Sequence, residues 1–361
     1  MENSQELVRQ FRDCIQAASA AHQPVRLRGG GTKDWYGQSL QGEVMDTRAC
    51  SGILAYEPTE LVITARCGTP LAEIEEVLAA QGQMLAFEPP HFGPGATLGG
   101  MVAAGLSGPR RQAVGAVRDF LLGVVLMDGR GEVLHFGGQV MKNVAGYDVS
   151  RALAGSMGTL GLILEASLKV LPVPFAEATL HLNLSQADAL THLNEWGGQP
   201  LPISASAWQG ESLLVRLSGA QAAVLAAREK LGGELIEDGP TVWMDLREQR
   251  IGYFSDAAPA GISLWRLSLP SSAPVLDLPG EQLIEWGGAQ RWLKSDAPAE
   301  LIRTKVTQAG GHATLFRSAD NIDGSVGVFH PLAPVVAQIH QRLMQSFDPA
   351  GIFNPGRMYA V

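Results

Sequence analysis

The sequence is poor in cysteine, and its few cysteines do not form a recognisable chemical motif. The 361 residues contain only Cys14, Cys50 and Cys67, with no CxxC pair. An odd number of widely spaced cysteines fits neither a disulfide framework nor a cysteine-held zinc or iron–sulfur cluster. Cys50 and Cys67 stand in apolar, strand-like segments, a context typical of inert core thiols.

Charged residues are also scarce. They make up 17% of the chain, against about 25% in an average soluble protein. Acidic residues exceed basic ones by nine, which gives a net charge of −9. A protein of this sign has no general attraction to nucleic-acid backbones or anionic membranes. We therefore expect no nucleic-acid partner.

Long hydrophobic runs are absent from the sequence. No segment reaches the roughly 18 apolar residues of a membrane-spanning helix. Residues 1–12 mix charged and apolar side chains and do not resemble a secretory signal. These two observations predict a cytoplasmic chain without a transmembrane segment.

Hydrophobic periodicity predicts the elements of the first half. Apolar residues at helical spacing predict a helix over 5–21. Thr69 is a favourable N-cap and Pro70 a favourable first residue for a second helix, whose buried stripe is Leu71, Ile74 and Leu78. Short apolar runs predict strands at 25–27, 43–46, 52–56, 61–66, 120–127, 132–136 and 160–171.

Pro172 and Pro174 mark the expected domain boundary, because the glycine-rich signatures thin out after them. Beyond it, two rounds of strands, hairpins and helices, among them a helix near 241–254, predict an antiparallel sheet covered by helices on one face. A last helix is expected over 334–347. The sequence thus predicts an α+β protein in three parts, residues 1–174, 175–333 and 334–361, the last packing back toward the first.

Glycine is abundant, with 42 residues, and three clusters lie in the first half. They are 28–32, 93–100 and 155–161, each followed by an apolar run. Successive glycines allow backbone N–H groups to turn toward one point and form an anion nest, for which a pyrophosphate is a natural occupant. Three such clusters favour a nucleotide site over ordinary turns.

Two common nucleotide-binding motifs are nevertheless missing. There is no GxxxxGK[ST] loop, which excludes an ordinary P-loop kinase or ATPase. Gly93-Pro94-Gly95 begins a GxGxxG fingerprint, but Leu98 occupies the last glycine position and no βαβ pattern surrounds it. A nicotinamide dehydrogenase of the Rossmann type is therefore not expected.

The segment 24–172 resembles the FAD-binding domain of the vanillyl-alcohol oxidase / p-cresol methylhydroxylase (PCMH/VAO) type. The chain's end is similar to the tail of that family's C-terminal domain. The closest resemblance is to the smaller FAD-binding subunits of glycolate oxidase (glycolate dehydrogenase). The stretches that carry it are Arg28-Gly-Gly-Gly-Thr32, Ala96-Thr-Leu-Gly-Gly100, Ser107-Gly-Pro-Arg-Arg111, Arg118-Asp119, Lys142-Asn-Val-Ala-Gly-Tyr-Asp148, Gly155-Ser-Met-Gly-Thr-Leu-Gly161 and Phe347-Asp-Pro…Phe353-Asn-Pro-Gly356.

This resemblance implies a fold and a set of FAD contacts. The fold is a two-subdomain FAD-binding domain followed by an antiparallel-sheet α+β domain. The first loop is expected to cradle the pyrophosphate, the second to pass beside it, and the third to run along the adenosine part. The implied cofactor-binding residues are Arg28, Gly29, Gly30, Gly31, Thr32, Lys33, Gly95, Ala96, Thr97, Leu98, Gly99, Gly100, Asn143, Gly146, Tyr147, Asp148, Gly158, Leu160, Gly161, Ile163 and Arg357.

Departures from the family pattern limit what can be carried over. Thr32 stands where some relatives attach the flavin through a histidine, and no cysteine lies near Ala96, so FAD is expected to be held without a covalent bond. The last glycine motif has Met157 where many relatives have glutamate. Nothing between 175 and 346 matches the His-x-Gly-Asp-Gly-Asn-x-His segment with which relatives bind metal and substrate. The sequence therefore identifies no catalytic residue and no metal ligand.

The implied function is that of an FAD-dependent oxidoreductase subunit in a complex that oxidises glycolate to glyoxylate. The implied partners are a larger FAD-binding subunit and an iron–sulfur subunit, through which the chain would be at most peripheral to the inner membrane. Two alternatives remain open: a stand-alone D-2-hydroxy acid dehydrogenase, and a scaffold subunit without redox activity.

Three individual residues also allow two interpretations. Arg110 and Arg111 could clamp a carboxylate or pair with acids of a partner chain. His91 could act as a base over the flavin or simply bond within its loop.

Overall fold

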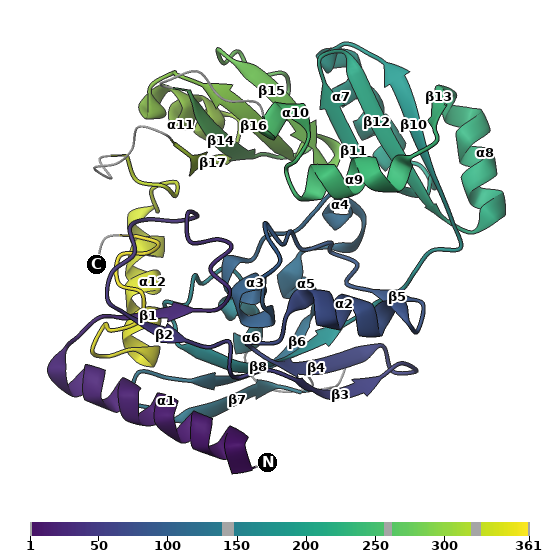
Figure 1. Cartoon of the computed structure of the whole chain (residues 1–361). Helices are drawn as coiled ribbons and strands as arrows, with labels where there is room; N and C mark the ends of the chain where they lie inside the picture. Colours follow the sequence, from purple (N-terminus) through teal and green to yellow (C-terminus); the bar gives the residue numbers. More distant parts are fainter. Residues whose placement is uncertain (1, 139–147, 256–261, 319–325, 360–361) are drawn as a thin grey trace. The chain divides into compact units, whose positions relative to one another are not determined.

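The computed structural model describes residues 2–138, 148–255, 262–318 and 326–359 (Figure 1). The chain forms two compact units. Unit 1 comprises Met1–Leu106, Ala116–Pro172 and Pro331–Val361; unit 2 comprises Ser107–Gly115 and Val173–His330. The sequence-based division did not anticipate that Ser107–Gly115 leaves the first unit and packs within the second.

A five-stranded antiparallel sheet forms the centre of unit 1. Its order is β3-β4-β8-β6-β7 in the described residues. The middle strands are apolar along most of their length and largely buried. The elements of this unit are α1 (Glu2–Ala21), β1 (Val25–Arg28), β2 (Glu43–Asp46), β3 (Ile53–Glu57), β4 (Val62–Arg66), α2 (Leu71–Ala79), β5 (Gln83–Met84), α3 (Leu98–Ala104), α5 (Val117–Phe120), β6 (Leu121–Met127), β7 (Val133–Gly137), α6 (Val149–Leu153), β8 (Leu162–Lys169), β9 (Leu171–Pro172) and α12 (Pro334–Phe347).

The tail after α12 is part of the first unit's fold. β1 and β2 pair in parallel, and Phe353 forms a parallel bridge with Val25 on β1. Val25 N donates to Ile352 O at 2.7 Å, and Asn354 N donates to Val25 O at 2.9 Å. The C-terminal residues therefore extend the two-stranded ribbon that leads into the first glycine loop.

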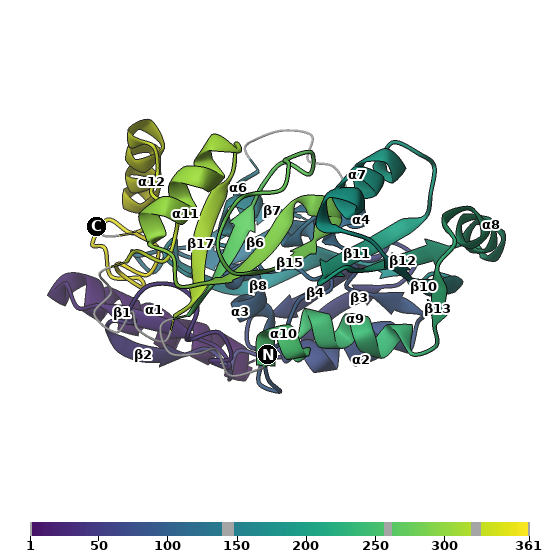
Figure 2. The same ribbon diagram turned by 90° about the horizontal axis from the view of Figure 1, so that it is seen from above.

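Unit 2 is an eight-stranded antiparallel sheet with helices on both faces. The strand order in the described residues is β13-β10-β12-β11-β15-β16-β14-β17 (Figure 2). Its elements are α4 (Arg111–Val114), β10 (Ala176–Asn183), α7 (Gln186–Gly197), β11 (Ile203–Gln209), β12 (Ser212–Gly219), α8 (Gln221–Leu231), β13 (Glu234–Ile236), α9 (Gly239–Arg247), α10 (Gly252–Ser255), β14 (Ser263–Ser268), β15 (Glu281–Glu285), η1 (Trp286–Gly288), β16 (Gln290–Ser295), α11 (Ala299–Gln308) and β17 (His312–Arg317).

Strand alternation divides the second unit's sheet into two faces. Leu180 joins the apolar core that α7 and α8 cover, and Leu267 joins the core that α11 covers. Thr179 points to the opposite face, where its hydroxyl accepts a hydrogen bond from Trp243 of α9. The predicted α+β class and antiparallel sheet are thus confirmed, but α9 occupies the face that the sequence analysis left uncovered (Figure 1).

Two local predictions were wrong. Thr69 does not cap α2, because its hydroxyl accepts from Gly52 N at 2.9 Å and Pro70 occupies the N-cap position. The single helix expected over 241–254 is two helices, α9 and α10, and Gln249 between them has a positive φ of 55°. Left-handed backbone at that residue ends a right-handed helix.

Buried polar contacts hold Ser107–Gly115 within unit 2. Arg110 is 5% exposed, and its guanidinium lies 2.6 Å from Glu177 on β10 and 3.1 Å from Ser218 on β12. The Arg111 guanidinium stacks over Trp286, 4.2 Å from the ring centroid. Arg110 is therefore occupied within its own chain rather than by a partner, and Arg111 covers a tryptophan.

The Glu177–Arg110 pair predicts a pH-dependent contribution to stability. Burial raises the pKa of Glu177, but hydrogen bonds from Arg110 and Ser218 outweigh it, so the pKa is lowered. A carboxyl group whose folded-state pKa is lowered stabilises the fold at pH values above its ordinary pKa of about 4.3. This contribution to stability is lost as the pH falls through the folded-state pKa.

We expect Glu177→Gln to reduce the free energy of unfolding by about 2 kcal/mol at pH 7, because it leaves the Arg110 charge buried and uncompensated. The loss is moderated because the Glu177 side chain is 35% exposed. Urea unfolding at pH 7 and pH 4 measures it, and the difference between variant and wild type should shrink at pH 4. An equal difference at both pH values would contradict the assignment.

Candidate functional site

The three glycine clusters of the sequence meet in one pocket of unit 1. We call it the glycine pocket. Its volume is about 70 Å³. It is lined by Leu27, Arg28, Gly29, Thr47, Cys67, Gly99, Gly100, Ala103, Met157, Gly158, Gly161, Leu162, Ile163 and Asn354. The predicted residues Arg28, Gly29, Gly99, Gly100, Gly158, Gly161 and Ile163 are therefore brought together from three distant stretches of sequence.

The first two glycine loops touch backbone to backbone. A Cβ added to Gly30 would lie 1.5 Å from Gly95 O, and one added to Gly29 would lie 2.3 Å from Thr97 Oγ1. No side chain can occupy position 30 without separating the loops, and one at position 29 would displace the Thr97 hydroxyl. Glycine is required here because of close approach.

The first loop also has backbone N–H groups for which the described residues provide no acceptor. Within the part of the chain that the structure describes, the N–H groups of Gly29, Gly30, Gly31 and Thr32 donate to no protein acceptor. Backbone donors in folded proteins are nearly always satisfied by protein, water or a ligand. Successive N–H groups of this kind suit an anion with several oxygens.

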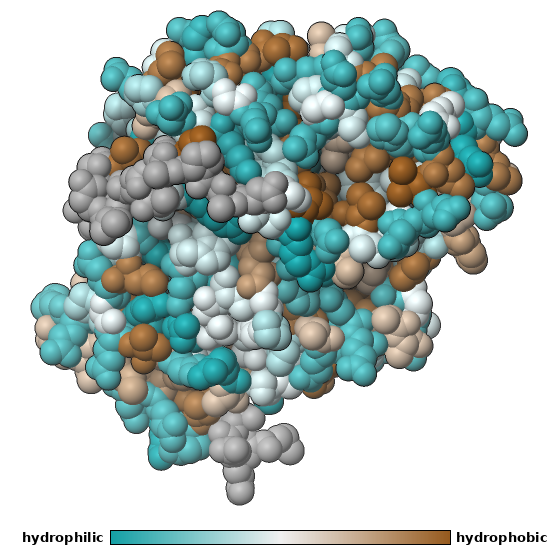
Figure 3. All heavy atoms as spheres, turned by 45° about the horizontal axis from the view of Figure 1, so that its top comes forward, coloured by the Kyte–Doolittle hydropathy of each residue, from teal (hydrophilic) through white to brown (hydrophobic). Residues whose placement is uncertain are grey.

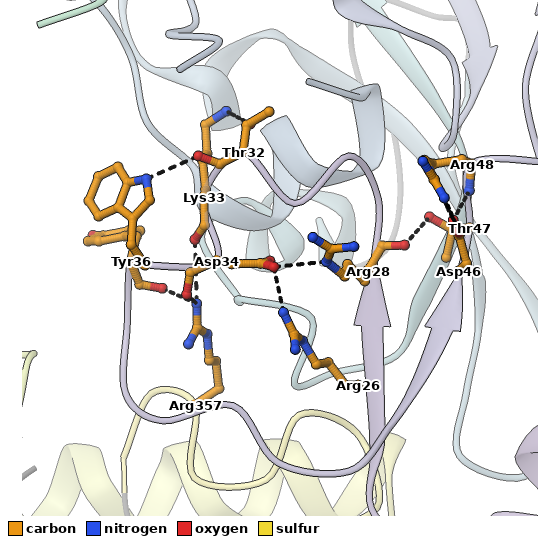
Figure 4. A network of polar contacts seen from close by, with 11 residues as sticks. Arg26, Arg28, Thr32, Lys33, Asp34, Tyr36, Asp46, Thr47, Arg48 and Arg357 are labelled. Atoms are coloured by element: carbon orange, nitrogen blue, oxygen red, sulfur yellow. Dashed lines mark hydrogen bonds and ion pairs between the residues drawn. The ribbon is translucent and has the colours of Figure 1, made fainter. Parts of the chain in front are cut away.

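Positive charge gathers at this loop although the chain as a whole is acidic. Residues 24–38 carry Arg26, Arg28 and Lys33 against a single acid, Asp34. The Asp34 carboxylate accepts from Arg26 at 2.5 Å and from Arg28 at 2.8 Å, which fixes both guanidinium groups (Figure 4). Lys33 Nζ donates to His91 O at 3.1 Å. The local excess of cations complements an anionic ligand.

Arg357 holds the segment that follows the first loop. It is 5% exposed, and its guanidinium donates to the carbonyls of Lys33, Asp34 and Tyr36 (Figure 4). It also donates to the carbonyl of Gln38. Burial lowers the pKa of Arg357 to about 10, so it remains charged at neutral pH. Its donors are directed at backbone carbonyls, which makes it a positioning residue in this structure.

Asn354 joins two of the loops and was not among the predicted site residues. Its Nδ2 donates to Met157 O at 2.7 Å, and its Oδ1 accepts from Leu27 N at 2.9 Å. A Cβ on Gly158 would lie 2.6 Å from Asn354 Nδ2, so the amide fills the space that this glycine leaves. The Phe-Asn-Pro-Gly tail was the signal that could have identified it.

Other predicted site residues form the framework of the pocket. Thr97 is the N-cap of α3, and its hydroxyl accepts from Gly100 N at 3.3 Å. Ala96 O and Leu98 N bond to residues flanking the start of α2, and Leu160 is buried. These residues position the glycines.

Two further predicted residues, Asp148 and His91, do not line the glycine pocket. Asp148 pairs with Arg151 at 2.7 Å and accepts from Ser150. His91 Nε2 lies 3.2 Å from Glu75. Asn143, Gly146 and Tyr147 lie outside the described residues.

The residues of this site fit the diphosphate part of a dinucleotide. Unsatisfied N–H groups, two fixed guanidinium groups and side-chain-free backbone are what two phosphates need. The pocket volume of about 70 Å³ suits a phosphate-sized group. The pocket can therefore hold the phosphates of FAD.

No helix in the described residues combines the length and the apolar composition that a membrane span requires. The same residues contain no group of three or more His, Cys, Asp or Glu side chains arranged to hold a metal ion.

Several known proteins are similar to this chain. Residues 6–137 match the family model described as FAD binding domain. The chain is 50% identical over 357 residues to glycolate oxidase subunit GlcE of Escherichia coli, covering 99% of this chain and 97% of the relative. Over part of its length it is 30% identical to glycolate oxidase subunit GlcD of Bacillus subtilis, covering 46% of this chain and 36% of the relative.

More distant similarities concern the first half and the fold. D-lactate dehydrogenase of Archaeoglobus fulgidus is 34% identical over 159 residues, covering 41% of this chain and 33% of the relative. A solved structure of alkyldihydroxyacetonephosphate synthase has a TM-score of 0.64 at 16% identity and covers 95% of this chain and 74% of that one. This likeness confirms the predicted fold. The chain belongs to the glycolate oxidase subunit GlcE family, and it contains that family's FAD binding domain.

Proposed function

We propose that the chain is the FAD-binding subunit of a complex that oxidises glycolate, or a related 2-hydroxy acid, to the 2-oxo acid. The observation that carries the proposal is the set of N–H donors of Gly29–Thr32 that no acceptor in the described residues takes up, in a loop that also carries Arg28 and Lys33. It is supported by the full-length similarity to a glycolate oxidase subunit. FAD, when bound, supplies two-electron chemistry.

The chain's own residues hold and orient the cofactor in this proposal. Gly29, Gly30 and Gly31 offer backbone donors to the phosphates, while Arg28 supplies positive charge. Leu160, Gly161 and Ile163 flank the adenosine part. Thr32 and Ala96 offer no attachment point for a covalent flavin bond, so binding is non-covalent. Contacts from Asn143, Gly146 and Tyr147 complete the proposed site.

The proposed partners are a larger FAD-binding subunit, which oxidises the substrate, and an iron–sulfur subunit, which receives the electrons. The described residues support a subunit role through helix α12, none of whose side chains is buried. Val335 and Ile339 on this helix are 68% and 60% exposed, and Arg342 is its only charged residue. Apolar side chains exposed together on one helix are typical of an interaction site. On the face drawn in Figure 3, hydrophobic residues are interspersed with hydrophilic ones.

The similarity to D-lactate dehydrogenases supports a second candidate function, that of a stand-alone 2-hydroxy acid dehydrogenase. Steady-state assays with glycolate and an artificial electron acceptor distinguish the two. We expect no turnover by the purified yellow chain alone and turnover after co-purification with both partner subunits. Turnover by the chain alone would establish the second candidate, and a colourless chain that still assembles would establish a scaffold without redox activity.

Gly30→Ala tests the phosphate cradle. The added methyl group would collide with Gly95 O, so the two loops must separate. We expect FAD affinity to fall at least about ten-fold, equivalent to 1.4 kcal/mol, while circular dichroism shows an intact fold. The measurement is the flavin-to-protein absorbance ratio and titration of the flavin-free chain. Gly197→Ala is the matched control, because nothing lies within 4 Å of its added methyl group. Unchanged flavin binding in a folded Gly30→Ala chain would refute the cradle.

Asn354→Gly tests the tail's role in positioning the loops. Asn354 has a positive φ of 42°, which glycine adopts without strain, so the variant removes the amide without disturbing the backbone. It leaves Met157 O and Leu27 N without their partners, and we expect a stability loss of about 1–3 kcal/mol. FAD affinity should fall with it. Asn354→Asp, which keeps the acceptor and loses the donor, should also weaken binding. Affinity unchanged in both variants would show that the tail does not position the site.

A further inference from the structure

Two cysteines that the proposed function does not use lie side by side in unit 1. The backbone N–H of Gly68, the residue that follows Cys67, donates to Cys50 O at 2.7 Å. Both cysteines also approach the same carbonyl on β8: Cys67 N donates to Leu164 O at 2.9 Å, and Cys50 Sγ lies 3.9 Å from it. Residues 17 positions apart in the sequence are thereby placed next to one another.

The turn that carries Cys50 is fixed directly against the peptide that follows Cys67. A Cβ added to Gly68 would lie 2.4 Å from Thr47 O and 2.8 Å from Cys50 O. The turn is closed by Cys50 N, which donates to Thr47 O at 3.0 Å. Neighbouring peptides in hydrogen-bonded contact keep their Cα atoms close to the range of about 4.4–6.8 Å that a disulfide requires.

Cys50 also lines a large groove beside α1. The groove has a volume of about 680 Å³. Arg9 and Arg12 of α1, together with Ser51, Arg66 and Glu165, contribute to its lining. Cys67, by contrast, lines the glycine pocket. A small polar reagent can therefore approach the pair from the groove, on the side of Cys50.

The two thiols differ in acidity. Interaction with the Cys67 thiol lowers the pKa of Cys50, and the positive charge of Arg66 adds to this effect against burial and the charge of Glu165. Interaction with Cys50 and burial both raise the pKa of Cys67. At neutral pH Cys50 therefore carries the larger fraction of thiolate, which is the reactive form.

We propose that Cys50 and Cys67 are a redox-active pair, in which a hydroperoxide entering the groove beside α1 oxidises Cys50 and Cys67 then closes a disulfide with it. The sequence analysis assigned both residues to an inert core. The structure gives the pair what a lone core thiol lacks: a thiol neighbour, a cationic group and a route from solvent.

The chemistry balances with hydrogen peroxide as the oxidant. The Cys50 thiolate attacks one peroxide oxygen, so an S–O bond forms while the O–O bond breaks, and the leaving hydroxide takes up the thiol's proton to become water. The Cys67 sulfur then attacks the Cys50 sulfenic sulfur; the S–S bond forms, the S–O bond breaks, and hydroxide leaves with the Cys67 proton as a second water. The two thiols lose two electrons and the peroxide is reduced to two waters.

Peptide mapping of the full-length wild-type chain tests the proposal. The reduced protein is treated with hydrogen peroxide, quenched with an alkylating reagent and digested with trypsin. Cleavage after Arg48, Arg66 and Arg110 places the two cysteines in separate peptides, 49–66 and 67–110. We expect these peptides to become disulfide-linked at a rate that rises with pH and levels off below the ordinary thiol pKa of about 8.5. Cys14, an exposed cysteine on α1, serves as the internal comparison.

Two variants test the order of the steps. In Cys67→Ala, Cys50 should accumulate as a sulfenic acid that a dimedone probe traps. In Cys50→Ala, oxidation of Cys67 should slow by about ten-fold or more. Oxidation of Cys14 without any linked peptide in the wild type would overturn the proposal, as would equally fast oxidation of Cys67 in Cys50→Ala.

Discussion

The site depends on the contact between the backbones of Gly30 and Gly95. A Cβ added at Gly30 would meet the Gly95 carbonyl oxygen at 1.5 Å, a separation shorter than any non-bonded contact. The second loop therefore passes directly over the first, and the N–H groups of the first loop are left for a ligand to satisfy. Affinity in such a cradle comes from donors that are already oriented, so little ordering is needed on binding.

This contact is supported from distant parts of the chain. The β1–β2 ribbon that leads into the first loop is extended by the tail residues Ile352–Asn354. The segment after the loop is held by Arg357, whose hydrogen bonds go to backbone carbonyls. Asn354 ties the strand entering the first loop to Met157 in the third. The last residues of the chain thus contribute to a site that is otherwise formed by its first half. Loss of the tail contacts should act on cofactor binding through geometry alone.

Local patterns in the sequence were sufficient to predict much of this. Glycine clusters predicted the loops, and apolar periodicity predicted α1, α2 and most strands, because both properties depend on near neighbours. Long-range partners could not be predicted this way. The amide of Asn354 meets a carbonyl 197 positions earlier, and the Thr69 hydroxyl bonds to Gly52 instead of capping its helix. Arg110 had two plausible roles in the sequence, and only the fold showed that Glu177 and Ser218 surround it.

The central claim is that the glycine loops recognise the diphosphate of FAD. Competitive titration of the flavin-free chain with FAD, riboflavin and ADP, followed by flavin fluorescence, tests it most directly. If the cradle provides the main recognition, ADP should displace FAD, and riboflavin, which has no phosphate, should bind at least about ten-fold more weakly, a loss of 1.4 kcal/mol or more. Riboflavin binding as tightly as FAD, with no competition from ADP, would contradict the account.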